Sequence, residues 1–137
     1  MYALQEKGIV HRDIKPSNIL LDETQKTIKI ADFGQAVFYS AMKTLNQGTP
    51  LYMAPEILIP ENFELIKDRR SDVWSLGLVL YEMLMGKHLF EKNKSMTYFQ
   101  FQNFIKKQKT FMNPPFPDYL EKEWTVFRQK MLMPNYL

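Results

Sequence analysis

Apolar and polar positions in the second half of the chain follow patterns typical of helices. The run Val73–Met85 is almost entirely apolar, and Gly86 follows it directly. A run of this length predicts a buried helix that begins at the capping pair Ser71-Asp72 and ends at Gly86. Weaker periodic patterns predict two further helices, at residues 95–107 and 118–131.

The first half of the chain has shorter apolar runs, which predict strands and loops. Residues 1–7 have the pattern of the last turns of a helix, and residues 9–18 that of a loop. Two short runs, 19–21 and 27–30, are separated by a polar turn and predict a β-hairpin. The long irregular stretch 31–56 is typical of a functional loop. We therefore expect a mostly α-helical domain with a small β-hairpin patch.

Composition narrows the class of protein. The chain has 137 residues, of which 45% are hydrophobic and 24% charged, as in an ordinary globular domain. Its net charge of +3 comes without a dense Lys/Arg run, so we expect no nucleic-acid partner. The absence of Cys excludes disulfides and thiolate metal sites. No apolar run is long enough for a membrane span, and no signal peptide is evident, so a cytoplasmic protein is expected.

The string His11-Arg12-Asp13-Ile14-Lys15-Pro16-Ser17-Asn18 gathers candidate chemistry on one loop. A carboxylate such as Asp13 can accept a proton from a hydroxyl, and a nearby cation such as Lys15 can hold a transferred anionic group. The amide oxygen of Asn18 suits a hard metal ion. Taken alone, Asp13 could equally be a turn residue and Asn18 a residue at a strand entry.

A second candidate group, Asp32-Phe33-Gly34, directly follows the predicted strand 27–30. A carboxylate at a strand exit is well placed to hold a metal ion against phosphates. The alternative interpretation is the end of a hairpin with a buried Phe.

Together with Met53-Ala54-Pro55-Glu56 and Asp72-Val73-Trp74-Ser75-Leu76-Gly77, these strings resemble the eukaryotic-type serine/threonine protein kinase family, in its order and close to its spacing. The resemblance covers nearly the whole chain. It implies a partial kinase domain over residues 1–137 with the fold of the C-terminal, catalytic lobe. The N-terminal lobe, with its glycine-rich loop and strand lysine, is missing from the sequence.

The resemblance implies a role for each matching residue. Asp13 corresponds to the base that accepts the substrate hydroxyl's proton, and Lys15 to the lysine that neutralises the transferring γ-phosphoryl group. Asn18 and Asp32 correspond to ligands of Mg²⁺, and Leu20 to a side chain against the adenine ring. ATP and Mg²⁺ are thus the implied cofactors, and proteins with Ser or Thr hydroxyls the implied substrates.

Other residues have implied supporting roles. Thr49 is expected to reach Lys15 and Asp13 and, with Lys15, indicates Ser/Thr rather than Tyr as the acceptor. Val79 and Met83 are expected to form a core floor under Leu20. The residues with implied structural or regulatory roles are His11, Arg12, Phe33, Gly34, Glu56 and Asp72, the last as the acceptor of backbone N–H bonds from the His11-Arg12 turn.

Candidate phosphorylation sites lie in the loop that follows Gly34. In the family, an arginine at the position of Arg12 commonly binds a phosphate there, and Ser40 and Thr44 are the candidates. Residues 44–49 resemble the Unc-51-like and Aurora-like pattern with one extra residue. An unmodified, solvated Thr44 is an equal alternative.

The sequence also departs from the family. Leu137 stands where an arginine normally pairs with the glutamate that matches Glu56, so we expect Glu56 to be unpaired. The lone His88 is expected at the surface. Three interpretations remain: a piece of an active kinase with little activity alone, a shortened pseudokinase that binds proteins as a scaffold, and a decaying duplicate. The intact residues Asp13, Lys15 and Asn18 favour the first.

Overall fold

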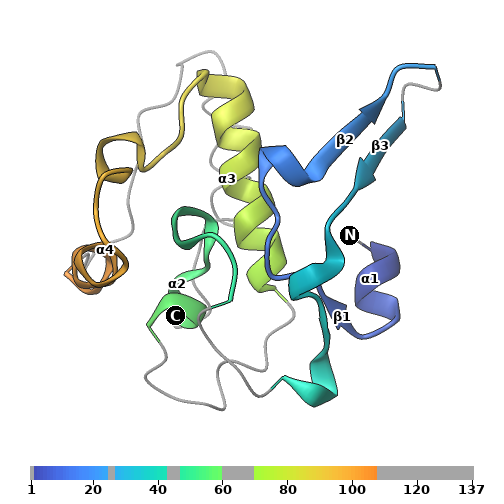
Figure 1. Ribbon diagram of the computed structural model, residues 1–137, viewed down its shortest axis with the longest axis horizontal. Coiled ribbons are helices and arrows are strands. Elements are labelled where there is room, and N and C mark those ends of the chain that lie inside the picture. Colours follow the sequence, from blue (N-terminus) through green and yellow to red (C-terminus); the bar gives the residue numbers. More distant parts are fainter. Residues whose placement is uncertain (1, 25–26, 43–46, 60–69, 108–137) are drawn as a thin grey trace, which may run out of the picture.

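The computed structural model describes residues 2–24, 27–42, 47–59 and 70–107. Its helices are α1 (Tyr2–Glu6), α2 (Pro55–Leu58), α3 (Ser71–Met85) and α4 (Tyr98–Lys106). Its strands are β1 (Ile9–Val10), β2 (Ile19–Asp22), β3 (Thr27–Ile30) and β4 (Val37–Phe38), and short 3₁₀ turns lie between them. Within these ranges the expected helical character and small antiparallel β-structure are confirmed (Figure 1). None of the helices described is long and apolar enough to cross a membrane.

The predicted hairpin is present, and a second sheet accompanies it. β2 and β3 pair antiparallel, with Leu21 opposite Ile28, and the hairpin extends away from α3 in Figure 1. β1 and β4 form another antiparallel pair, which the sequence analysis missed. Strands of two residues are too short to show an alternating pattern, so the interpretation of residues 9–18 and 31–56 as loops was wrong at these points.

Helix α3 begins at Ser71 and ends before Gly86, as predicted, but the predicted capping pair does not cap it. Gly86 has φ of 66°, the left-handed conformation that glycine adopts at a helix C-terminus without steric cost. At the N-terminus the cap position is Arg70, which makes no side-chain capping bond, so the predicted capping pair is wrong. The Asp72 carboxylate instead accepts hydrogen bonds from the backbone N–H groups of His11 and Arg12.

Helix α4 is shorter than the predicted span of 95–107. It starts after Thr97, whose hydroxyl accepts from Gln100 N while the Gln100 side chain accepts from Thr97 N. This capping box satisfies two N–H groups at the helix start, which explains why the helix begins there. Another helix, α2, begins within the segment predicted to be irregular. The predicted helix 118–131 lies outside the described residues.

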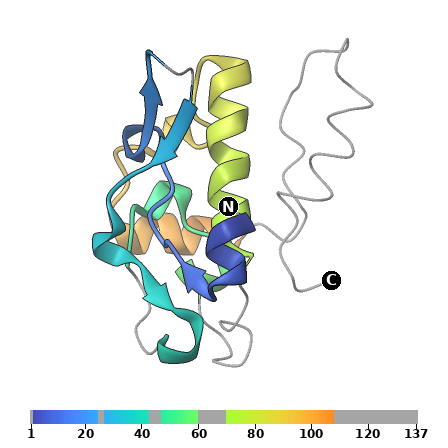
Figure 2. The ribbon, with the colours of Figure 1, turned by 90° about the vertical axis from the view of Figure 1, so that its right-hand side faces the viewer.

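The core lies between α3, α2 and α4 (Figures 1 and 2). Trp74, Leu78 and Tyr81 of α3 pack in one buried cluster with side chains of α2 and α4. Tyr98 and Gln102 of α4 both donate hydrogen bonds to the carbonyl oxygen of Leu58 at the end of α2. The remaining members of the cluster are Met53, Ala54, Ile57, Leu58, Phe90 and Phe101.

The structure places the side chains of His88 and Met83 contrary to the predictions from the sequence. His88 is buried, with 2% of its surface exposed, so its prediction as a surface residue is wrong. Its Nδ1 accepts a hydrogen bond from Phe90 N at 2.9 Å, and its ring packs edge-on against Tyr52 at 4.6 Å. Met83, predicted to be core, is 71% exposed, whereas Val79 is buried as expected. A lone polar residue carries no periodic signal, so the sequence could not show that His88 packs inward.

We predict that His88 makes folding stability depend on pH near neutrality. Desolvation lowers its pKa from 6.5, although Glu82 and Glu91 act to raise it and Lys94 to lower it. A depressed pKa means that the stabilising contribution of the neutral ring is complete above about pH 6.5 and is lost as the pH falls. Protonation of Nδ1 also removes the acceptor for Phe90 N.

Chemical unfolding at pH 7.5 and 5.5 measures this effect in the parent chain and in His88→Leu. The parent should lose more stability at the lower pH than the variant does. An equal loss in both would contradict the prediction, because the dependence on pH would then come from other groups.

Candidate active site

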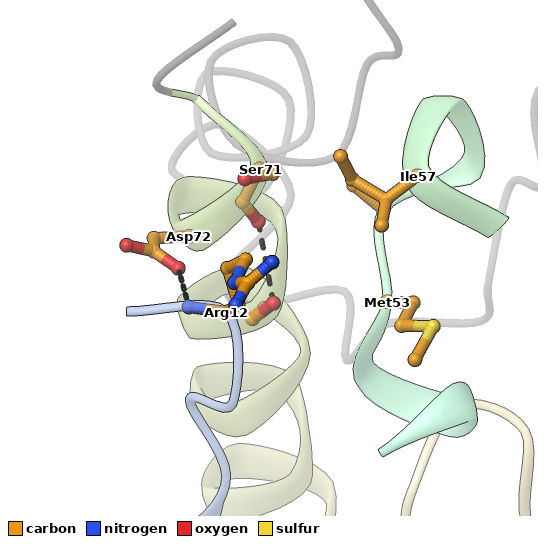
Figure 3. Close-up of a pocket in the computed structure, with 7 residues that line it drawn as sticks. Arg12, Met53, Ile57, Ser71 and Asp72 are labelled. Atoms are coloured by element: carbon orange, nitrogen blue, oxygen red, sulfur yellow. Dashed lines mark hydrogen bonds between the residues drawn. The ribbon is translucent and has the colours of Figure 1, made fainter. Parts of the chain in front are cut away.

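The catalytic-loop string is attached to helix α3 through Asp72. The Asp72 carboxylate accepts a hydrogen bond from Arg12 N at 2.9 Å, which Figure 3 shows, and another from His11 N at 2.7 Å. Burial raises the pKa of Asp72, while the two N–H donors oppose that rise. Arg12 has φ of 68°, a conformation that non-glycine residues seldom adopt. The contact expected of Asp72 is therefore present, and it holds a strained backbone.

His11 joins the catalytic loop to the end of β3. Its Nδ1 accepts from Asp13 N at 3.3 Å, so its Nε2 carries the proton and lies 3.0 Å from the carbonyl oxygen of Ala31. The ring of Phe33 packs edge-on against the imidazole at 4.9 Å. His11 and Phe33 thus pack against each other beside the catalytic-loop string. The carbonyl of Ala31 is a backbone acceptor, for which a sequence offers no signal.

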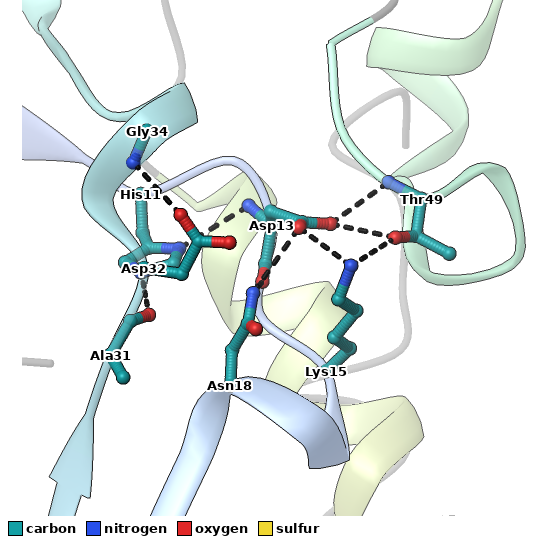
Figure 4. A network of polar contacts seen from close by, with 8 residues as sticks. All are labelled: His11, Asp13, Lys15, Asn18, Ala31, Asp32, Gly34 and Thr49. Atoms are coloured by element: carbon teal, nitrogen blue, oxygen red, sulfur yellow. Dashed lines mark hydrogen bonds and ion pairs between the residues drawn. The ribbon is translucent and has the colours of Figure 1, made fainter.

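The Asp13 carboxylate lies at the centre of the polar network (Figure 4). Its Oδ1 accepts from Thr49 N at 3.0 Å and from Thr49 Oγ1 at 2.8 Å. Its Oδ2 lies 2.8 Å from Lys15 Nζ and accepts from Asn18 Nδ2 at 3.2 Å. Lys15 Nζ also donates to Thr49 Oγ1 at 2.9 Å. The structure therefore brings together four residues that the sequence singled out.

The surroundings of Asp13 favour its charged form. Burial raises the pKa of this carboxyl, but hydrogen bonds from Lys15 and Thr49 and the Lys15 charge outweigh burial and leave the pKa below its ordinary value. A carboxylate held ionised can accept a hydrogen bond from a hydroxyl and then its proton.

Asn18 and Asp32 offer oxygen atoms suited to a hard cation. Asn18 donates through Nδ2 to the Asp13 carbonyl at 2.9 Å, which leaves Oδ1 on the opposite side of the amide. Ala31 N donates to the carbonyl oxygen of Asn18 at 2.8 Å. Asp32 is the next residue after Ala31, so its backbone lies near Asn18. Asp32 is exposed, and one of its oxygens accepts from Gly34 N at 3.2 Å. An amide oxygen and a carboxylate are the ligand types that Mg²⁺ accepts, so these residues fit such an ion.

The remaining predicted residues occupy different surroundings. Leu20 is 52% exposed on the hairpin, and Ser40 is exposed in a 3₁₀ turn. Thr44 lies outside the described residues. Glu56 is buried and takes part in an interaction, so the expectation that it is unpaired is wrong. Arg12 Nε donates to the carbonyl oxygen of Gln35 at 2.6 Å. This bond joins Arg12 to the loop that follows Gly34, a link that the sequence did not reveal.

Comparison with known proteins agrees with these motifs. The sequence model of the protein kinase domain matches residues 1–136. Citron rho-interacting kinase of Rattus norvegicus is 44% identical over 119 residues, which cover 77% of this chain and 6% of that protein. Serine/threonine-protein kinase atg1 of Dictyostelium discoideum is 47% identical over 88 residues, covering 61% of this chain and 13% of that protein.

Serine/threonine-protein kinase ULK1 of Homo sapiens is 35% identical over 122 residues, covering 82% of this chain and 11% of that protein. The expected similarity to Unc-51-like kinases is therefore confirmed by matches that cover 64% and 82% of this chain. The chain spans only a small part of the length of each relative it matches.

We predict that the pKa of Asp13 rises when its cationic partner is removed. Lys15→Met deletes both the hydrogen bond and the charge that lower this pKa, whereas Thr49→Val deletes only the hydroxyl bond. The rise should be larger in Lys15→Met, as followed by NMR titration of the Asp13 carboxyl carbon. Lys29→Met is the matched control, because Lys29 pairs with Asp22. A shift in the control as large as in Lys15→Met would contradict the assignment.

Proposed function

Because this chain belongs to the protein kinase family, we propose that it carries the catalytic lobe of a serine/threonine kinase, which transfers phosphate from Mg-ATP to protein hydroxyls. The observation that carries the proposal is the Asp13 carboxylate held among Thr49, Lys15 and Asn18. A carboxylate base with a cation in hydrogen-bond reach, beside an amide side chain whose oxygen is free to hold a metal ion, is an arrangement suited to phosphoryl transfer to a hydroxyl.

The two oxygens of Asp13 have different surroundings, which suggests different tasks. Oδ1 receives both the N–H and the hydroxyl of Thr49, and these contacts orient the carboxylate. The partners of Oδ2 are the amide of Asn18 and the long, partly exposed side chain of Lys15, which can move aside. We therefore assign Oδ2 as the atom that accepts the proton of the substrate hydroxyl.

Lys15, Asn18 and Asp32 are suited to binding the second reactant, Mg-ATP. When bound, Mg-ATP supplies the phosphoryl group and the metal charge that stabilises it. The ammonium group of Lys15, already beside Asp13, would neutralise charge on the transferred group. Asn18 and Asp32 would hold the magnesium through their oxygens.

The choice of acceptor follows from the position of Thr49. Its hydroxyl bridges Asp13 and Lys15, so the backbone that follows it lies close to the base. Thr49 thus fixes its loop beside the base, where a short acceptor side chain such as Ser or Thr would approach. The protein partners are thus substrates with exposed Ser or Thr.

A protein-binding scaffold is the second candidate function, and one observation favours it. Several large apolar side chains on the hairpin and on the segment after it are exposed: Leu20, Leu21, Ile28, Phe33 and Phe38. Exposed apolar groups of this kind often mark a surface that another protein covers. Retention of the Asp13 network favours catalysis, because a scaffold has no need of a positioned base.

We predict that phosphate transfer depends on Asp13 once a nucleotide-binding lobe is supplied. Residues 1–137 would be joined to the segment that precedes the matching region in human ULK1 and assayed with a Ser/Thr peptide library and Mg-ATP. Asp13→Asn should lower kcat by about 10²–10⁴-fold, the usual size of general-base effects. Asp22→Asn, a change at an aspartate of the hairpin, is the matched control. Activity of Asp13→Asn within a few-fold of the parent would remove Asp13 from this role.

We also predict that a polypeptide of these 137 residues alone transfers little phosphate. It contains the proposed base and metal ligands but no glycine-rich loop, and Leu20 and Phe33 are about half exposed, at 52% and 48%. A nucleotide bound to one open face stays solvated and poorly aligned with a hydroxyl. Calorimetry with Mg-ATP and a radiolabel assay measure this on the purified chain. Micromolar affinity with turnover that disappears in Asp32→Asn would refute it.

A further inference from the structure

We propose that Gly48 is a positioning residue that places the backbone of Thr49 against the base Asp13. This inference rests on the proposed function, because it assigns a task within the same site. Gly48 directly precedes Thr49, and Thr49 N donates to Asp13 Oδ1 at 3.0 Å. The position of residue 48 therefore decides whether this N–H reaches the carboxylate.

Gly48 can occupy its position only because it has no side chain. A Cβ atom there would lie 2.2 Å from the carbonyl oxygen of Arg12 and 3.3 Å from its carbonyl carbon. Both are backbone atoms, so no side-chain rotation could relieve the overlap. The φ of Gly48 is also 112°, a value that residues with a Cβ avoid.

The Arg12 carbonyl has little freedom to move away. Arg12 N and His11 N are both bound to the buried Asp72 carboxylate. On the side-chain end, Arg12 Nε is bound to the Gln35 carbonyl at 2.6 Å. A clash at residue 48 would therefore displace residue 48 and with it Thr49, rather than the catalytic loop.

Other glycines of the chain provide matched comparisons. Gly8 and Gly86 each have φ of 66°, but a Cβ at either position would meet no atom within 4 Å. Alanine at Gly8 or Gly86 imposes only the strain of a positive φ. Alanine at Gly48 imposes the overlap with Arg12 as well, at a φ further from the left-handed region that other residues can adopt, so the Gly8 and Gly86 variants control for the strain of a positive φ elsewhere in the chain.

Amide hydrogen exchange of Thr49, followed by NMR in the 137-residue chain, tests the proposal without any activity assay. In Gly48→Ala the Thr49 amide should exchange about tenfold faster or more than in the parent, the change expected when a hydrogen bond of ordinary strength is lost. In Gly8→Ala and Gly86→Ala it should stay within about twofold of the parent, since neither change touches the Thr49 contact. Equal exchange in Gly48→Ala and the parent, or an equal increase in all three variants, overturns the proposal.

A second variant keeps the test decisive if Gly48→Ala does not fold. Thr49→Val removes the hydroxyl bond to Asp13 but keeps the backbone N–H. If residue 48 sets the backbone position, the amide of residue 49 stays protected within a few-fold of the parent. An amide that exchanges as fast as that of the exposed residue Glu23 shows that the hydroxyl sets the position, and the proposal fails. Because both readouts are structural, this failure is distinct from a failure of the proposed catalysis.

Discussion

The site depends on one buried interaction, the Asp72 carboxylate that accepts the backbone N–H groups of His11 and Arg12 from 61 and 60 positions away. Removing a carboxylate from water is costly unless it is hydrogen-bonded, and two N–H donors offset that cost. In return, a loop with almost no regular structure is attached to the longest helix described. Arg12 has a left-handed backbone, and Asp72 binds its N–H group and the N–H group of the residue before it.

Through these hydrogen bonds, the first turn of α3 holds the loop that contains Asp13. Once the backbone before Asp13 is held, His11 can bind both Asp13 N and the carbonyl of Ala31, which brings the end of β3 beside the catalytic loop. Thr49 approaches the same carboxylate from a third segment of the chain. Three segments distant in sequence therefore converge on Asp13, and the hydrogen bonds from Lys15 and Thr49 keep it ionised despite its burial.

Apolar side chains near Asp13 are buried on the helical side and exposed on the hairpin. The helices α2, α3 and α4 enclose a continuous apolar core, whereas apolar residues of the hairpin such as Leu21 and Ile28 remain exposed. The proposed catalytic residues lie where these regions meet. Asp13 and Asn18 belong to the buried side and are held by hydrogen bonds, whereas Asp32 is open to solvent. The proposed base is held by hydrogen bonds and the proposed metal ligand is accessible to solvent. Both are compatible with a site that excludes water only when its reactants are bound.

Local features of the structure were predictable from the sequence. The β2–β3 hairpin, the end of α3 at Gly86 and the short-range contacts among Asp13, Lys15 and Asn18 involve neighbouring residues, whose pattern a sequence shows directly. The pairing of β1 with β4, the inward position of His88 and the exposure of Met83 were not predictable. The close approach of Gly48 to Arg12 was not predictable either. These features depend on contacts between distant segments, and only the packing of the tertiary structure decides which distant backbone or side chain lies opposite.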